Sequence, residues 1–174
     1  AISLGAHALP WREPQAGDFL SADWNPVTPG FFRAMRIPLR QGRLLDGRDG
    51  IKSQRVFLVN EAFARKAFPD GDALGKRIIV RMGDLTPGEI VGIVGDIRYT
   101  ALTELVQPTV YYPHTQLYMG FMHLVVRTSV PPETLANAVT AAVHAVDREL
   151  PLGAVRPLTE VLADSIARSR FTTM

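Results

Sequence analysis

Two β-branched runs near the middle of the chain constrain its fold more than any other feature. In the stretch from Lys76 to Arg98, Ile78-Ile79-Val80 is followed by Ile90-Val91 and Ile93-Val94. The residues between the runs include four turn formers, namely Gly83, Asp84, Pro87 and Gly88. This pattern predicts two strands joined by a short loop. Because the apolar residues come in doublets, we expect both faces of this ribbon to be buried by the rest of the chain.

Composition favours a folded protein of one domain or two small subdomains. The chain has 174 residues, of which 47% are hydrophobic and 21% charged, and this length can bury a sizeable core. Its 19 basic residues are spread from Arg12 to Arg170 without a cluster, which argues against nucleic-acid binding. The absence of cysteine excludes disulfides, thiolate metal sites and cysteine nucleophiles.

Neither a membrane span nor a signal peptide is expected within these residues, since no apolar run approaches ~18 residues. The chain begins at Ala1 and stops at Met174 without a helix-ending signal. We therefore expect it to be a piece of a longer protein.

The N-terminal third predicts a linker followed by short elements. Residues 1–18 have no hydrophobic period and read as an entering linker, with Leu9 and Trp11 against the surface. A strand is expected from Phe19 to Val27. A short helix is expected from Pro29 to Met35, capped by Thr28, with one buried side formed by Phe31, Phe32 and Met35. A polar loop is expected from Arg40 to Gly50.

The middle of the chain predicts a buried strand and a short helix. Arg55 to Asn60 is rich in β-branched and aromatic residues, and Asn60 is a good N-cap for a helix from Glu61 to Phe68. We expect one apolar helix face, formed by Phe63, Ala64, Ala67 and Phe68. A further short strand is expected from Thr109 to Tyr112.

The last third predicts a strand, an amphipathic helix and a second strand. The strands are expected at Phe121 to Arg127 and Ala154 to Pro157. The helix begins at Pro131-Pro132-Glu133 and keeps its apolar spacing as far as Val146. A second helix starts at Leu158. Such a unit needs a partner sheet or a second unit of the same kind to bury its other side.

Two apparent nucleotide motifs do not match what phosphate binding requires. The segment Gly71 to Arg77 has three residues between its glycines where a phosphate loop has four, and Arg77 stands where Ser or Thr binds magnesium. Gly88, Gly92 and Gly95 lie inside a strand pattern with no helix opening after them. We attribute these three glycines to close backbone packing and turns.

No residue is expected to be catalytic, to bind a cofactor or to ligate a metal, and the chain is not expected to be an enzyme. The four histidines are far apart, with no carboxylate partner at helical spacing: His7, His114, His123 and His144. Ser165 and Ser169 lack a nucleophile elbow. Asp70 and Asp72 read as a loop that ends a helix rather than an acid and base pair.

Three blocks of sequence resemble the extracytoplasmic core domain of MacB-like ABC transporter permeases. The first is Val27-Thr-Pro-Gly-Phe-Phe-Arg-Ala-Met-Arg-Ile-Pro-Leu-Arg-Gln-Gly-Arg. The second is Val59-Asn-Glu-Ala-Phe-Ala-Arg-Lys-Ala-Phe-Pro with Leu74-Gly-Lys-Arg-Ile, and the third is Ile90-Val-Gly-Ile-Val-Gly-Asp-Ile-Arg. Leu158-Thr-Glu-Val-Leu and Ser169-Arg-Phe are similar to the family's approach to its second membrane helix.

The resemblance implies an α+β fold in which a β-rich inserted (Sabre-like) subdomain, residues 19–116, is carried on a porter-like strand-helix-strand subdomain. Residues 117–174 would be the second half of that subdomain, leading toward a membrane helix. The family's first half has no counterpart here, which would leave one face under-covered.

The resemblance also implies a non-catalytic, periplasmic or extracytoplasmic domain of an inner-membrane permease. It would couple cytoplasmic ATP hydrolysis to movement of a substrate or an adaptor protein, with no cofactor of its own. The implied partners are an ATP-binding subunit or domain, a second permease copy in the full-length protein and an adaptor. The alternative is a ligand-binding or sensory domain.

Two further expectations concern association and movement. The isolated chain is expected to be a monomer or a weak dimer, unless the missing half exposes an apolar patch. Leu158 to Met174 has one apolar face, and Arg168 and Arg170 stand where a chain meets lipid headgroups. We expect this helix to continue into a membrane span and to transmit movement, the alternative being a terminal helix that only packs.

Overall fold

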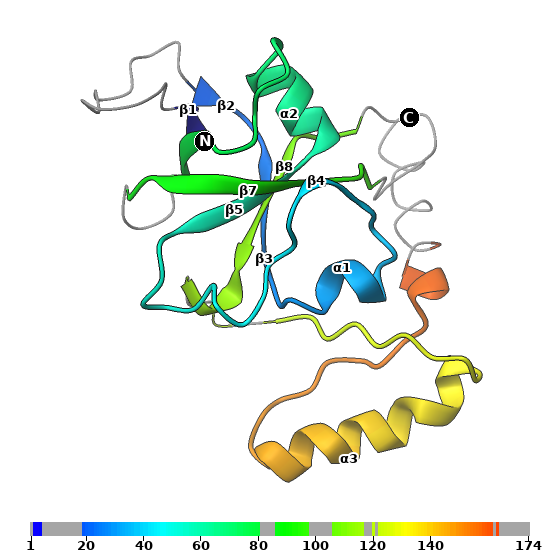
Figure 1. The fold of residues 1–174 in the computed structure, drawn as a ribbon. Helices are drawn as coiled ribbons and strands as arrows, with labels where there is room; N and C mark the ends of the chain where they lie inside the picture. The colour runs from blue at the N-terminus through cyan, green and yellow to red at the C-terminus, as the bar shows by residue number, and fades with distance from the viewer. Residues whose placement is uncertain are drawn as a thin grey trace, which may run out of the picture. The chain divides into compact units, whose positions relative to one another are not determined.

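A computed structural model describes residues 2–4, 19–80, 86–97, 106–116, 120, 122–161 and 163 (Figure 1). By its internal contacts the chain divides into two units. Unit 1 contains Ala1–Ile97 and Leu105–Val125, and unit 2 contains Arg98–Glu104 and Val126–Met174. The described strands and helices confirm the expected α+β class.

Unit 1 holds a mixed sheet, and unit 2 holds the longest described helix. The strands are β1 (Ile2–Leu4), β2 (Phe19–Leu20), β3 (Asp23–Val27), β4 (Leu39–Gly42), β5 (Val56–Asn60), β6 (Arg77–Val80), β7 (Gly88–Val94) and β8 (Thr109–Pro113). The helices of unit 1 are α1 (Phe31–Ala34), α2 (Glu61–Ala67) and the 3-10 turn η1 (His114–Gln116). Unit 2 contains the 3-10 turn η2 (Pro132–Leu135) and α3 (Ala136–Val146).

Strand β7 is the centre of the sheet. The strand order is β2-β1-β6-β7-β5-β8-β3, and β4 also pairs with β7. All of β5 pairs with β7, and the two strands are parallel. Strand β6 pairs in antiparallel fashion with the first residues of β7, and β4 does so with its last residues. Because a strand has two edges, β6 and β4 share the edge that β5 leaves open. The prediction of two central strands is confirmed by β6 and β7, which pair with each other in antiparallel fashion.

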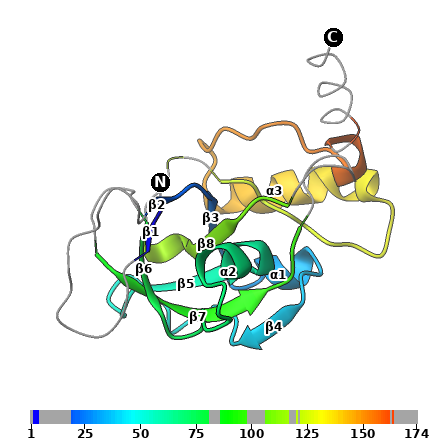
Figure 2. The same ribbon diagram turned by 90° about the horizontal axis from the view of Figure 1, so that it is seen from above.

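Both faces of this central region are buried, as the doublets predicted. Along β5, Phe57 and Val59 belong to one hydrophobic cluster, and Val56 and Leu58 belong to another. The first cluster contains Phe63 from α2. The second is capped by α1, so helices cover opposite faces of the same strands (Figures 1 and 2). Each fully buried side chain of this size contributes about 1.5–3 kcal/mol before entropy is counted.

Aromatic packing fixes α1 on its face of the sheet. Phe32 is fully buried and meets the ring of Tyr111 from β8 edge to face, with the ring centroids 5.2 Å apart. Phe31 meets Phe32 in the same manner at 5.4 Å. This geometry is favourable beyond area burial alone, because ring edges and ring faces carry opposite partial charges.

The predicted cap Asn60 is confirmed, and it also links two strands. Its Oδ1 accepts hydrogen bonds from the backbone N–H groups of Phe63 and Thr109, both at 2.9 Å. Its Nδ2 donates to the carbonyl of Gln107 at 2.9 Å. Asn60 is 1% exposed, so these backbone groups have no solvent alternative. One buried amide therefore ties the start of α2 and the start of β8 to the end of β5.

Two predictions for the first half of the chain were wrong. Ile2–Leu4 forms strand β1 where a linker was expected, because its backbone pairs with β6 with Ile2 opposite Val80. A three-residue strand has too little periodicity to be seen in sequence, and its partner lies more than 70 residues away. The loop expected from Arg40 begins with β4 instead, since Leu39–Gly42 pairs with β7. Leu9 and Trp11 lie outside the described residues.

The start of α1 also differs from its prediction. The helix begins at Phe31 after Gly30, without a side-chain cap, whereas Pro29 was expected as its first residue with Thr28 as its cap. The backbone N–H of Phe31 reaches the carbonyl of Thr28 at 3.0 Å, so a turn occupies the expected first positions. Met35 is only half-buried.

Helix α3 confirms the strongest helix prediction, but the strands expected on either side of it are not formed. Residues 122–127 and 154–157 have no strand assignment, because they form no backbone ladder with another described strand. Met122 and Leu124 are 62% and 67% exposed. The strand-helix-strand order is present instead in unit 1, where β5, α2 and β6 follow one another.

The second helix of unit 2 begins at Leu158, as predicted. Residues 158–161 and residue 163 are helical. Arg168 and Arg170 lie outside the described residues. Within the described ranges, no helix is both long and apolar enough to cross a membrane.

Replacing Gly92 by alanine is expected to destabilise unit 1 because β4 and β7 approach each other closely there. A Cβ on Gly92 would lie 2.3 Å from the carbonyl oxygen of Arg43 and 2.5 Å from Leu58 Cδ2. Overpacking of this kind costs about 1–3 kcal/mol. Urea unfolding should show that loss for Gly92→Ala. Gly47→Ala is the matched control, since a Cβ there meets nothing within 4 Å. Equal stability of the two variants would contradict the packing role of Gly92.

Candidate functional site

The described residues do not assemble a metal-binding cluster. In residues 2–4, 19–80, 86–97, 106–116, 120, 122–161 and 163, no group of three or more His, Asp or Glu side chains could hold a metal ion. His114 belongs to η1, His123 follows it at an exposed position, and His144 is half-buried on α3. His7, Ser165 and Ser169 lie outside the described part of the chain.

The segment from Gly71 to Arg77 is a turn into a strand and not a phosphate loop. A phosphate loop opens a helix, whereas this segment leads directly into β6. The Lys76 Nζ lies 2.7 Å from a carboxylate oxygen of Asp72, so its charge already has a partner. Gly71 and Gly75 have φ values of +87° and +78°, which explains the glycines as turn residues. Asp70 is an exposed residue in the same turn.

The glycines of β7 and its C-terminal end are explained by close packing, as predicted. A Cβ on Gly88 would lie 2.3 Å from the ring of Phe57, and one on Gly95 would lie 2.9 Å from Pro38. Facing Gly92 across the β4–β7 pair, Gly42 has φ +73°, and a Cβ there would lie 2.3 Å from the carbonyl oxygen of Val91. These glycines allow neighbouring backbone and side chains to approach closely, which explains their positions without a nucleotide.

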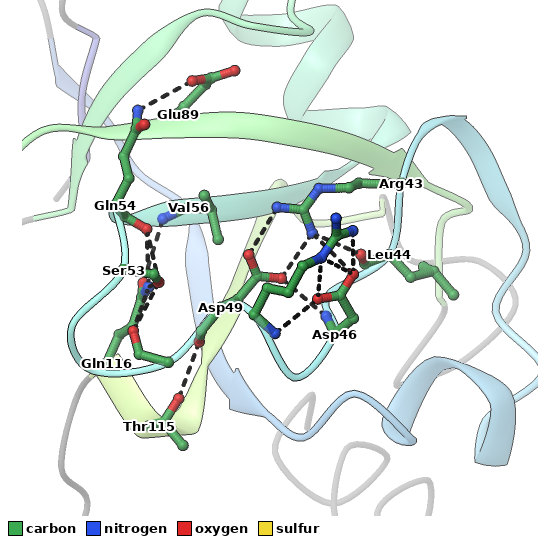
Figure 3. Close-up of polar contacts among 12 residues, drawn as sticks. Arg43, Leu44, Asp46, Asp49, Ser53, Gln54, Val56, Glu89, Thr115 and Gln116 are labelled. Carbon is green, nitrogen blue, oxygen red and sulfur yellow. Dashed lines mark hydrogen bonds and ion pairs between the residues drawn. The ribbon is translucent and has the colours of Figure 1, made fainter.

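The most organised polar cluster of unit 1 lies in the segment between β4 and β5 (Figure 3). The guanidinium of Arg43 donates from both terminal nitrogens to the two carboxylate oxygens of Asp49, each at 2.8 Å. Asp49 also accepts from the backbone N–H of Asp46 at 2.9 Å. The side chain of Asp49 is 4% exposed and that of Arg43 is 38% exposed. This two-point pairing holds a nearly buried carboxylate beneath a half-exposed cation.

The charges in this cluster reinforce one another. The hydrogen bonds from Arg43 hold the pKa of Asp49 below its ordinary value, although burial acts in the opposite direction. Arg48 forms a second ion pair with Asp46 at 2.7 Å, and its hydrogen bonds lower the pKa of the Asp46 carboxyl. The same hydrogen bonds raise the pKa of each arginine. Both carboxylates are therefore ionised throughout the physiological range and cannot serve as general acids.

A glutamine from η1 fastens the second half of the same segment. Gln116 Nε2, whose two hydrogens are shared among three acceptors, lies 3.3 Å from the carbonyl of Gly50, 3.0 Å from the hydroxyl of Ser53 and 3.1 Å from the carbonyl of Gln54. Gln116 Oε1 accepts from the backbone N–H of Val56 at 3.3 Å. One side chain thus satisfies four groups that lie 60 or more residues away in sequence.

Thr115 extends this attachment toward the buried aspartate. Its hydroxyl donates to the carbonyl of Asp49 at 3.2 Å. Loop 46–54, the segment from Asp46 to Gln54, is therefore held by Arg43 at one end and by η1 at the other (Figure 3). Ile51 at its turn is 79% exposed. The arrangement holds a loop in one position. Many of the polar groups in the cluster form hydrogen bonds with each other.

Sequence reasoning treated this region only as a polar loop. The one local signal was the pair Asp46 and Asp49 at i and i+3, a spacing that suits aspartates whose side chains bond nearby backbone N–H groups. The contribution of Gln116 had no local signal, because its partners are distant in sequence. The sequence alone offered no reason to single out Asp49 or Gln116 as residues that hold this loop.

Comparisons with known proteins agree with this fold. A sequence model of the family of MacB-like periplasmic core domains matches residues 10–146, which is more than half of the chain. No curated protein matches the chain. The crystal structure of the periplasmic region of MacB from Actinobacillus actinomycetemcomitans superimposes with a TM-score of 0.55 at 18% identity. That match covers 84% of this chain and 63% of the MacB chain.

A second solved structure is similar over a smaller part. The extracellular domain of the ABC-type transporter YknZ from Gram-positive bacteria matches with a TM-score of 0.41 at 20% identity, covering 53% of this chain and 43% of that one.

The sheet, its covering helices and the family match together define an extracytoplasmic domain of ABC transporter permeases. The chain belongs to the family of MacB-like periplasmic core domains. It spans 63% of the length of the solved MacB periplasmic region.

Replacing Asp49 by asparagine is expected to lower stability by about 1–3 kcal/mol at neutral pH, because Arg43 loses a charged, two-point partner. A carboxyl with a lowered pKa stabilises the fold above its unfolded value of about 3.8 and loses that contribution as pH falls through its folded pKa. The difference between wild type and variant should therefore shrink as the pH falls below about 4.

Urea unfolding at a series of pH values measures this difference. Asp70→Asn, at an exposed aspartate, is the matched control and should stay close to wild type throughout. A cost of Asp49→Asn that does not change with pH would show that the Arg43–Asp49 pair contributes no charge-dependent stability.

Proposed function

We propose that this chain is the extracytoplasmic part of a permease that couples ATP hydrolysis in the cytoplasm to the movement of a substrate or adaptor outside the membrane. The observation that carries the proposal is the family match over residues 10–146. The polar cluster of unit 1 supports it, since ionised, internally paired carboxylates suit bracing rather than catalysis. The chemical step would belong to a partner ATPase, and the permease would act as a dimer.

We also propose a domain organisation. Unit 1 would be the β-rich inserted subdomain, approximately residues 19–116, and the residues after it would be half of a porter-like subdomain. None of the described residues from 126 to 161 is buried, and large apolar side chains are exposed there, among them Val126, Leu150, Leu152 and Val155. An amphipathic helix in this condition needs a further apolar face. Polypeptide outside these residues would supply it.

Transmission of movement is the finer part of the proposal. The helix that begins at Leu158 would continue into a membrane span and carry the ATP-driven displacement to the domain. Its described residues are exposed, with Val161 at 42%, which supports a role in contacts with a further partner.

A full-length permease with its ATPase tests this function without knowledge of the substrate. Ile51→Cys, at a highly exposed position of a chain that contains no cysteine, accepts a spin label in a protein whose other cysteines have been replaced. The distance between the labels of the two copies should change when ATP is added. Hydrolysis without any change in this distance would contradict the proposed coupling.

Ala163→Pro is expected to uncouple this movement from hydrolysis. Proline in a helix removes one hydrogen bond and introduces a kink, at a cost of about 3 kcal/mol or more. The ATP-dependent distance change should fall while ATPase activity persists, and Ala163→Ser should behave as wild type. If the proline variant folds, inserts and moves as the wild type does, a rigid connection through this helix is excluded.

A further inference from the structure

Strand β4 has a hydrogen-bonded neighbour on one side only among the described residues. It pairs with β7, and the strand order gives it no second partner. All four residues of β4 are exposed, and the strand lies at the margin of unit 1 in Figure 2. Strand β6, which shares the same edge of β7, pairs in turn with β1. The outer edge of β4 is therefore open at a level where the neighbouring part of the sheet continues by one more strand.

The hydrogen bonds from β4 toward β7 determine which of its backbone groups face outward. The carbonyl of Pro38 accepts from the N–H of Gly95, which directly follows β7, at 2.8 Å. The N–H of Arg43 donates to a carbonyl of β7 at 3.0 Å. In a trans peptide unit the C=O and the N–H point in opposite directions. The N–H of Leu39 and the carbonyl of Gly42 therefore point away from β7.

An extended segment of another protein can bond both of these outward groups. They lie about 10 Å apart by the rise of a strand, so about four residues of an added strand reach from one to the other. In such strand addition, main-chain hydrogen bonds supply affinity and the flanking side chains supply specificity. None of the described residues bonds the Leu39 N–H or the Gly42 carbonyl, so no existing contact has to break first.

The side chains around this edge favour a negatively charged partner. Residues 31–45 include four arginines and no aspartate or glutamate. Arg33 and Arg36 are exposed, and neither has an ion-pair partner among the described residues. The Arg40 side chain remains 52% exposed although it lies 3.4 Å from Glu61. Arginines in this arrangement attract an acidic segment and make its association sensitive to salt.

The same arginines disfavour a second copy of this chain as the occupant of the edge. Pairing of two β4 edges about a two-fold axis would bring two basic segments opposite each other, and like charges at facing positions destabilise a sheet. Basic side chains on an edge strand oppose self-association for this reason. A partner segment rich in aspartate or glutamate meets no such repulsion.

We propose that the outer edge of β4 binds an extended, acidic segment of another protein as an added strand. The backbone of that segment accepts from the N–H of Leu39 and donates to the carbonyl of Gly42. Its carboxylates face the arginines of residues 33–40. The binding surface lies wholly within unit 1 and does not depend on the proposed coupling function.

Peptide binding to the 174-residue chain tests this proposal. The probe is a short capped peptide that alternates valine with glutamate, and its matched control has lysine in place of glutamate. Amide chemical shifts should show saturable binding of the acidic peptide around residues 38–43, with the lysine peptide weaker by about tenfold or more. The Leu39 N–H should become protected from hydrogen exchange in the complex. Added salt should weaken the binding.

Leu39→Pro removes the outward N–H and leaves the bonds from β4 to β7 in place, because proline is tolerated on an edge strand where its nitrogen faces solvent. Binding of the acidic peptide should weaken by about tenfold, as expected for the loss of one hydrogen bond. Leu39→Ala keeps the N–H and should bind as the wild type does. Unchanged exchange of the Ile93 amide in the proline variant verifies that β4 still pairs with β7.

Arg33→Gln and Arg36→Gln, made together at exposed positions outside the strand, test the charge preference without altering β4. This variant should bind the acidic peptide more weakly and with less dependence on salt.

Three results would overturn the proposal. The first is that the wild type shows no saturable binding of the acidic peptide up to about 1 mM, or binds the lysine peptide equally well. The second is unweakened binding by Leu39→Pro with its sheet intact. The third is a wild-type dimer in sedimentation whose Leu39 N–H is protected without any peptide, since a second copy then occupies the edge.

Discussion

The fold of unit 1 depends on how closely other strands can approach β7. This strand pairs with β5 along one edge and with β6 and β4 in succession along the other. Such an arrangement requires β4 to enter where β6 leaves, and Gly92 and Gly42 face each other at that point without side chains to keep the strands apart. This pairing sets the register of the sheet, and the register determines which of the two faces each side chain lies on. Each face carries one of the two hydrophobic clusters, and a helix covers each cluster.

Polar side chains hold the connections between strands and helices that the sheet itself does not position. Asn60 binds the backbone at the starts of α2 and β8, where water cannot reach. Arg43 and Asp49 perform the same task for the long connection between β4 and β5, and Gln116 completes it from the opposite side. The contacts of Arg43 and Gln116 fix geometry more than they contribute net free energy, because partly exposed ion pairs and hydrogen bonds are worth about 1 kcal/mol each. Their function in this chain is to hold loops in a defined place.

The success of the sequence predictions followed the range of the interactions that determine each element. Strand β5, its cap Asn60, α2, β7 and α3 were predictable because their signals lie in consecutive residues. Strands β1 and β4 were missed because their pairing with β6 and β7 is decided by residues far away in the chain. The strands expected beside α3 had the right composition, but a strand exists only with a neighbour. The Gln116 contacts could not be foreseen, since they depend on the completed fold.

The central claim is that unit 1 holds a core organised around β7, whereas none of the described residues of unit 2 from 126 to 161 is buried, so unit 2 opens more easily. Native-state hydrogen exchange, followed amide by amide on the isolated chain, tests this claim most directly. The account predicts that the amides of Ile90 and Ile93 in β7 exchange only through global unfolding of the chain. The amides of α3 should exchange through local openings whose free energy is lower by about several kcal/mol. If the amides of α3 and β7 instead share a single opening free energy, the two units unfold together and the account is contradicted.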